Sequence, residues 1–142
     1  MFDDDFDIPD DIAAMADSAA AALAEMGEEY AKDASKDADQ LLVFAERAKA
    51  AVDNEAVLVA MDDIFSIAHN FKGQGSTFGY ELVTLLGDAL CKISRPVNNP
   101  TLASVPQAVK ISAAIHTILH QRITGDGGEA GAKLCAELDL AA

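Results

Sequence analysis

The segment around His69 carries the residue types and spacing best suited to chemistry. Residues Ala68 to Gly79 read AHNFKGQGSTFG, with Lys72 three residues and Gly73 four residues after the histidine. In a helix, both positions lie one turn from the imidazole. An exposed imidazole is largely neutral at pH 7, so a ring nitrogen keeps the lone pair of a nucleophile. The ammonium of Lys72 could then reach an anion carried by the ring.

Three glycines follow the histidine, although a glycine inside a helix costs roughly 0.5–1 kcal/mol relative to alanine. Gly73 would leave a notch beside the imidazole through which the active site of another protein could approach. Gly75 falls nearer the core side and favours close helix packing. Gly79 can adopt the left-handed conformation that ends a helix.

Helical periodicity places His69 away from the core. A wheel with about 100° per residue puts one apolar arc opposite the histidine, and this arc contains Val57, Ala60, Ile64, Ile67, Phe71 and Phe78. The face of His69 is mostly polar and contains Asp62, Phe65, Ser66, Lys72, Gly73 and Ser76. This pattern argues against a packed core histidine, which is the usual alternative for a histidine in a helix. Asp62 and Asp63 lie about two turns away, and we interpret them as solvated surface charge rather than metal ligands.

Several neighbours of His69 are candidates for partner binding. Phe65 lies one turn before the histidine, and Met61 lies at the margin of the same face, so with Ser66 they could form a docking patch. The alternative is that Phe65 packs against a neighbouring helix. Gln74 and Ser76 could orient the ring or bind its anion, and each could equally be an ordinary polar surface residue.

The rest of the chain reads as helices that would hold this segment in place. Apolar periodicity predicts helices near residues 10–26, 28–52, 55–78, 80–93 and 102–123, with a short helical tail. Asn54 is the candidate N-cap of the third, and SRPVNNP separates the fourth from the fifth. We expect an all-α, up-and-down antiparallel four-helix bundle with an additional terminal helix. It would form a single domain over residues 1–142, with an acidic leader at 1–9 and a glycine-rich turn and short helix at 124–142.

The pattern of His69, Lys72, Gly73 and Gly79 resembles the histidine-containing phosphotransfer (HPt) domain of two-component phosphorelays. The stretch KGQGSTFGY is also similar to the phosphoacceptor domain of chemotaxis histidine kinases, and the helical resemblance extends over roughly residues 38–122. The resemblance implies that His69 accepts a phosphoryl group from a receiver aspartyl phosphate or a kinase and passes it to another receiver aspartate. Lys72 would offset the phosphoryl charge, and Gln74 or Ser76 could bind a phosphoryl oxygen.

The resemblance also implies partners. These are a response-regulator receiver domain, which would bring its own Mg²⁺, and a sensor or hybrid histidine kinase; the chain itself would need no cofactor or metal. Two features depart from the chemotaxis kinases. No glutamate can be assigned to orient the ring, and there is no room for ATP-binding and dimerisation domains. The glycine-rich TGDGGEAG lacks the Lys-Ser/Thr ending of a phosphate-binding loop and reads as a linker. A separate kinase must therefore supply the phosphate.

Composition narrows the remaining function classes. The 142 residues carry a formal net charge of -14, which disfavours nucleic acid and anionic membranes as partners and favours proteins. Cys91 and Cys135 have no redox-pair or zinc-ligand spacing and are expected to be reduced thiols. The N-terminus is acidic where a signal peptide is basic, and no apolar run suggests a membrane span. We expect a soluble, cytoplasmic monomer.

Two other functions compete with phosphotransfer. His116 and His120 are spaced i, i+4 in HTILH and could share a metal, but no third ligand is evident from the sequence. The chain could instead be a non-catalytic adaptor whose His69 is never phosphorylated. Lys72 and Gly73 weigh against an adaptor, because adhesion alone requires neither an ammonium nor a notch at those positions.

Overall fold

The computed structural model describes residues 10–138, and this range is helical without any β-strand. The prediction of an all-α chain is therefore confirmed for these residues, while the expected acidic leader at 1–9 lies outside them. The α-helices are α1 (Asp10–Ala50), α2 (Asn54–Gln74), α3 (Glu81–Ser94), α4 (Val105–His120) and α5 (Gly128–Glu137). Three short 3₁₀ helices, η1 (Ser76–Phe78), η2 (Pro96–Asn98) and η3 (Leu102–Ser104), join them.

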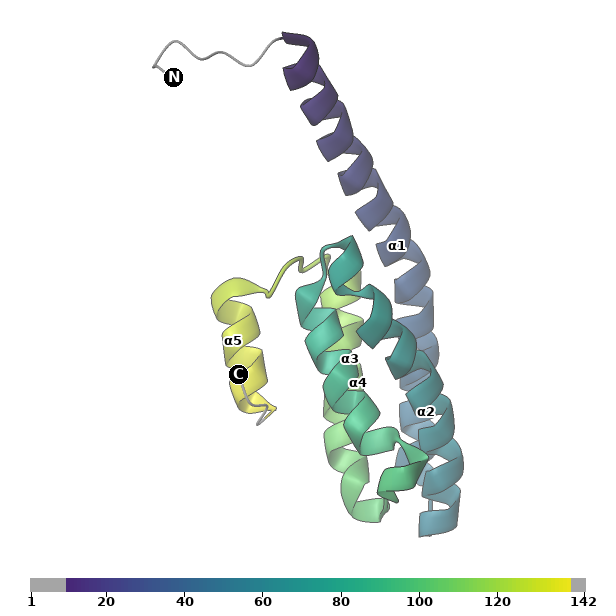
Figure 1. The fold of residues 1–142 in the computed structure, drawn as a ribbon. Helices are drawn as coiled ribbons and strands as arrows, with labels where there is room; N and C mark the ends of the chain where they lie inside the picture. Colours follow the sequence, from purple (N-terminus) through teal and green to yellow (C-terminus); the bar gives the residue numbers. More distant parts are fainter. Residues whose placement is uncertain (1–9, 139–142) are drawn as a thin grey trace.

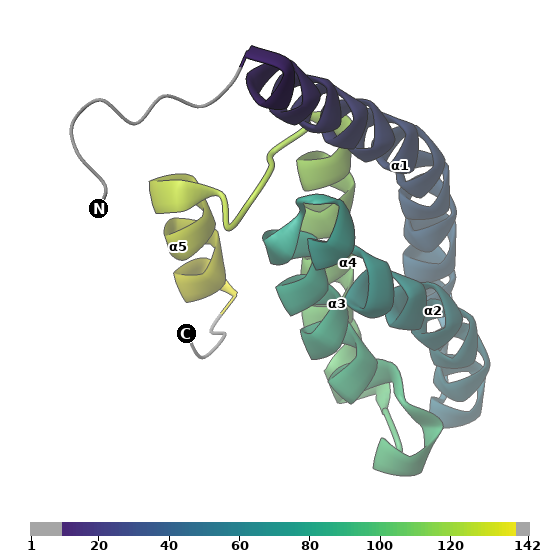
Figure 2. The ribbon, with the colours of Figure 1, turned by 45° about the horizontal axis from the view of Figure 1, so that its top comes forward.

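The first four helices pack around one apolar core. α2 packs against α1 and α3, and α4 packs against α1 and α3, so each helix has two neighbours. Figures 1 and 2 show consecutive helices running in opposite directions, with the N-terminal half of α1 projecting beyond the others. α5 lies on the side of α3, where the amide of Leu82 donates to the carbonyl of Gly125 before α5 begins.

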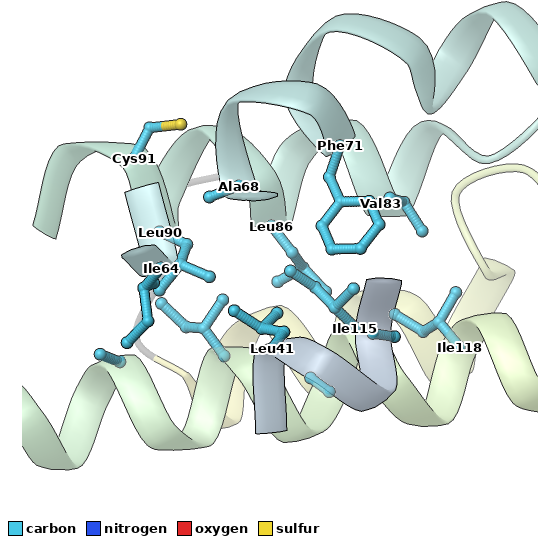
Figure 3. Close-up of a cluster of buried hydrophobic side chains, with 14 of the residues drawn as sticks. Leu41, Ile64, Ala68, Phe71, Val83, Leu86, Leu90, Cys91, Ile115 and Ile118 are labelled. Carbon is cyan, nitrogen blue, oxygen red and sulfur yellow. The ribbon is translucent and has the colours of Figure 1, made fainter. Parts of the chain in front are cut away.

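The core side chains come from all four of these helices. Figure 3 shows Leu41 of α1, Ile64 and Phe71 of α2, Leu86 and Leu90 of α3, and Ile115 and Ile118 of α4 converging. Burying a side chain of this size contributes about 1.5–3 kcal/mol each. The predicted apolar arc of the His69 helix is confirmed for Val57, Ala60, Ile64 and Phe71, which are buried, while Ile67 and Phe78 are partly buried.

α1 is one continuous helix, which corrects the prediction of two helices separated at Gly27. The residues after Gly27 are Glu-Glu-Tyr-Ala, with no proline to stop the helix. A Cβ at Gly27 would lie 3.3 Å from the carbonyl oxygen of Phe78. This glycine therefore lets η1 approach α1 closely, and it does not end the helix.

Other boundaries differ from the predictions by small shifts. Asp53, and not Asn54, caps α2, because its side chain accepts a hydrogen bond from the amide of Ala56 at 2.8 Å. The predicted second helix extended to residue 52, but α1 has already ended at Ala50, and Val52 is 87% exposed. The expected linker TGDGGEAG is partly helical, since α5 begins within it at Gly128.

The fifth predicted helix, residues 102–123, is divided into η3 and α4. The segment Leu102–His120 is long and apolar enough to cross a membrane by length and composition, with a mean hydropathy of 1.2. The sequence prediction that no apolar run suggests a membrane span is therefore corrected for this segment by length and composition. This is weak support for a span, because core helices of soluble proteins pass the same test, and Ile111, Ile115, Ile118 and Leu119 of α4 are buried against the other helices.

Tyr30 fixes η1 against α1. Its ring stacks on Phe78 with centroids 4.8 Å apart and lies 5.9 Å from the ring of Tyr80. Its buried hydroxyl makes no hydrogen bond within residues 10–138. Burial, and secondarily the charge of Asp37, raises the pKa of Tyr30 from 10.0 to about 12.

This pKa predicts an alkaline loss of stability that depends on Tyr30. Below pH 10 the phenol is protonated in both states, but between pH 10 and about 12 it ionises first in the unfolded chain and stability falls. The expected loss is up to about 2–3 kcal/mol, from 1.36 kcal/mol per pKa unit. Urea unfolding of wild type and Tyr30→Phe at about pH 8 and about pH 11 measures it. We expect Tyr30→Phe to be at least as stable as wild type at the lower pH, because it removes a buried hydroxyl that has no hydrogen-bond partner within the described residues, and we expect its advantage to grow at the higher pH. An advantage that is the same at both pH values would contradict this pKa.

Candidate functional site

His69 lies on the solvent-exposed face of α2, as the periodicity predicted. The buried Ala68 and Phe71 hold this turn of the helix against the core. The imidazole is 5.9 Å from the ring of Phe65, one turn earlier, and takes part in no hydrogen bond or ion pair within the described residues. Its ring nitrogens are therefore open to a partner molecule.

Lys72 also lies on the surface, where it is held by an acidic residue of α3. Its ammonium is 3.1 Å from one carboxylate oxygen of Asp88, and Lys92 is 3.1 Å from the other. The bonds from Lys72 and then Lys92 hold the pKa of Asp88 below its usual range. Ion pairs this exposed contribute only about 0–1 kcal/mol each. Lys72 can consequently leave Asp88 at little cost when a stronger anion is present.

A third cation, Arg95, completes the surroundings of His69. Its guanidinium lies over the Phe65 ring at 5.6 Å, and Phe65 in turn lies beside His69. Lys72, Lys92 and Arg95 thus place three of the ten lysine and arginine residues of the chain on this α2/α3 face. In a chain with a net charge of -14, the face is locally suited to an anion.

Two glycines near His69 differ in their surroundings. Packing between α2 and α3 requires Gly87 but does not require Gly73. A Cβ at Gly87 of α3 would lie 2.7 Å from the backbone nitrogen of Lys72 and 3.1 Å from the Cβ of Phe71. Gly87 therefore brings α3, and with it Asp88, close to α2. A Cβ at Gly73 would meet no atom within 4 Å, and Gly73 is exposed and helical. Internal packing therefore does not require a glycine at position 73. A glycine with open space around it is what we expect at a notch that admits a partner protein.

This contrast predicts opposite effects for two alanine substitutions. Gly73→Ala is expected to raise the free energy of unfolding by about 0.5–1 kcal/mol, because alanine favours the helix and finds open space. Gly87→Ala is expected to lower it by about 1–3 kcal/mol, because the added methyl would press on the backbone of α2. Urea denaturation of both variants tests this. A stabilised Gly87→Ala, or a destabilised Gly73→Ala, would contradict the packing described here.

The two other glycines of the motif behave as predicted. A Cβ at Gly75 would lie 2.6 Å from the hydroxyl oxygen of Thr84 and 2.8 Å from its backbone nitrogen, so Gly75 permits close packing with α3. Gly79 has φ 90° and ends η1 in the left-handed conformation. α2 itself ends earlier than expected, at Gln74, and η1 occupies the rest of the predicted helix.

The remaining predicted site residues do not all gather around His69. Met61 is fully buried, which corrects its assignment to an exposed docking patch. Phe65 is partly buried against the core, and its ring also faces Arg95. Ser66 is exposed, and its hydroxyl donates to the carbonyl of Asp62. Asp62 is exposed and Asp63 pairs with Arg47, in agreement with surface charge.

Gln74 and Ser76 are exposed but belong to other surroundings. Gln74 lines a groove of about 610 Å³ between α1 and the end of α2, together with Tyr30 and Phe78. The amide of Ser76 donates to the hydroxyl of Thr84 at 2.7 Å. Within residues 10–138 neither residue bonds to His69, so their predicted role with the ring stays a prediction.

Asp88, Lys92 and Arg95 were missed from the sequence. Lys92 and Asp88 are spaced i, i+4 on α3, which identifies an ion pair but not its contact with Lys72. That contact depends on which face of α3 meets α2. Gly87, directly before Asp88, is the one signal in the sequence for a close approach of another helix.

Comparisons of the chain with models of known protein families, with curated proteins and with solved structures found no match.

Proposed function

We propose that this protein is a phosphorelay intermediate of the HPt type, in which His69 carries the phosphoryl group. The observation that carries the proposal is an unpartnered, exposed imidazole with a lysine on its own helix face and a glycine that internal packing does not require. The proposal also takes α1 to α4 as the antiparallel four-helix bundle of such proteins, with α5 as the additional terminal helix.

The transfer step needs only the imidazole from this chain as a nucleophile. The lone pair of Nε2 attacks phosphorus in line with the bond to the receiver aspartate, so that an N–P bond forms as the P–O bond breaks. The electron pair of the broken bond stays on the aspartate, which leaves as a carboxylate. The reverse sequence delivers the phosphoryl group to a second receiver. Mg²⁺ and the carboxylates that hold it belong to the receiver.

Lys72 offsets charge on the phosphoryl oxygens during this transfer. Its present partner is a single, partly exposed carboxylate shared with Lys92. A phosphoryl group carries more charge and more acceptor oxygens than one shared carboxylate, and charge-assisted bonds to it are correspondingly stronger. We therefore expect Lys72 to turn from Asp88 to phosphohistidine, leaving Asp88 paired with Lys92.

The receiver is proposed to dock over the α2/α3 face around His69. Phe65 offers a partly exposed aromatic surface there, and Lys72, Lys92 and Arg95 complement the acidic residues with which a receiver holds Mg²⁺. The donor is a receiver domain or a sensor or hybrid histidine kinase. A monomer acting in the cytoplasm, with neither nucleic acid nor membrane as a partner, fits this function.

A phosphotransfer assay tests the proposal. The full chain is incubated with a radiolabelled phosphorylated receiver and Mg²⁺, and label is expected to leave the receiver and appear on this chain. A phosphohistidine is labile in acid and stable in alkali, which distinguishes it from an aspartyl phosphate or a phosphoserine. If receivers of the source cell bind the chain but never transfer label to it, the protein is a non-catalytic adaptor and the proposal is wrong.

A further inference from the structure

A second cluster of polar side chains lies where α1 packs on α4, away from the α2/α3 face that carries His69. Nε2 of His116 is 2.9 Å and Nε2 of His120 is 2.8 Å from the same carboxylate oxygen of Asp39. The two imidazole rings lie 4.2 Å apart by their centroids. Asp39 is the third potential ligand that the sequence alone did not provide.

The positions of these three residues are fixed by the core beneath them. His116 and His120 are one turn apart on α4, directly after the buried Ile115 and Leu119. Asp39 follows the buried Ala38 of α1. All three side chains are therefore set by backbone that is itself packed, while their polar ends face the solvent. Such positioning lets ligands converge without ordering a loop.

The donor atoms suit a transition-metal ion. The ligating atoms of Asp39, His116 and His120 all lie within 4.8 Å of one another. Metal–ligand distances near 2.0–2.2 Å place the ligands of one zinc ion at such separations after small side-chain adjustments. Two imidazole nitrogens and one carboxylate favour zinc and its neighbours, and disfavour Ca²⁺ and Mg²⁺, which prefer oxygen ligands.

Solvent access and charge favour occupancy of the cluster. The exposed side-chain fractions are 58% for Asp39, 30% for His116 and 41% for His120, so an ion can enter and water can complete its coordination. The strongly negative net charge of the chain also draws cations to its surface. A bound cation would replace the proton that each imidazole now needs to bond to Asp39.

We propose that Asp39, His116 and His120 bind one divalent transition-metal ion, with Zn²⁺ as the reference metal, and that the ion ties α1 to α4. The site is independent of the proposed phosphotransfer, since its ligands lie on α1 and α4 and His69 lies on α2. An ion held by two helices that are far apart in sequence stabilises the folded state, because the ligands do not converge in the unfolded chain.

Zinc titration of the full chain, without a histidine tag, tests this site. Isothermal titration calorimetry is expected to show one equivalent of Zn²⁺ bound, and thermal unfolding is expected to shift to a higher midpoint with Zn²⁺ but not with Mg²⁺. Co²⁺ should bind at the same stoichiometry and give visible absorption bands from histidine and carboxylate ligands. Absence of one-equivalent uptake by the wild-type chain would overturn the proposal.

Substitutions assign the ligands. His116→Gln, His120→Gln and Asp39→Asn are each expected to weaken Zn²⁺ binding by at least about 10–100-fold, the range seen when groups that support a metal site are removed. His69→Gln and Asp17→Asn remove a histidine and an aspartate elsewhere and should retain full uptake. If a ligand variant folds poorly, its Co²⁺ spectrum at low temperature, where helicity is retained, still reports the site. Tight uptake that survives His116→Gln and His120→Gln together would also overturn the proposal.

Discussion

Replacing His69 with glutamine is expected to abolish the proposed phosphorylation of this protein. Glutamine has a similar size and polarity, but its amide nitrogen has no free lone pair with which to attack phosphorus. Removing the nucleophile from a covalent mechanism costs on the order of 10³-fold or more in rate. Label transferred from a phosphorylated receiver to the His69→Gln chain should therefore fall to the background of the assay.

The other two histidines provide matched controls for this result. His116→Gln and His120→Gln make the same chemical change on α4 and should become labelled at the wild-type rate. Because His69 is exposed and has no hydrogen bond within residues 10–138, His69→Gln should unfold within about 0.5 kcal/mol of wild type. Acid-labile label that persists in His69→Gln would show that another residue is the phosphoacceptor.

Placing an arginine at Gly73 is expected to slow transfer by about 10–100-fold while leaving the fold intact. The Cβ of the new side chain points into open space, so the bundle has room for it. On the outer surface the same side chain occupies the notch beside His69, and in the proposed complex it would keep the receiver from its in-line approach. A displacement of about 1 Å between reacting groups can cost 10²-fold in rate. Initial rates of label transfer measure the effect.

Two further variants separate shape from charge in this experiment. Gly73→Gln is neutral and shorter than the arginine but still fills the notch, and it should slow transfer as well if access is what matters. Val59→Arg adds the same charge at a position that is 62% exposed, ten residues before His69 and about 15 Å away along α2. It should leave the rate unchanged. A wild-type rate for Gly73→Arg would refute the argument that this glycine provides access.

Helical periodicity was sufficient to predict the outward face of α2. The apolar residues of this helix recur with the helical period and mark the buried face, so the residues between them lie on the exposed face. His69, Lys72 and Gly73 therefore appear where expected. The width of the buried arc was not predictable in the same way. α2 packs against both α1 and α3, so its buried face is broad and includes Met61, which a wheel places at the margin.

The contacts between side chains on different helices could not be predicted from the sequence. The pairing of Lys72 with Asp88 joins two helices whose relative rotation is set by packing at Gly87. Asp39 lies 77 residues from His116 in the chain, and nothing local marks it as a neighbour. The predicted helix end at Gly27 was wrong for a related reason. A glycine that ends a helix and a glycine that allows a neighbouring segment to pack closely cannot be distinguished from the sequence alone.

α1 is one continuous helix, but its two ends are stabilised differently. The C-terminal part packs on the core, and the N-terminal part does not. The first contacts of α1 with other elements lie at residues 27–30 and its buried residues begin at Ala31, so about 25 Å of helix before them, at 1.5 Å per residue, has little tertiary packing. That portion depends on the high helix propensity of its alanines, which sustains helices only marginally in water. Opening of the helix should therefore begin at Asp10 and stop near Gly27, where α1 first contacts η1. Backbone amides would be protected in a gradient along α1, whereas those of the core helices would open together.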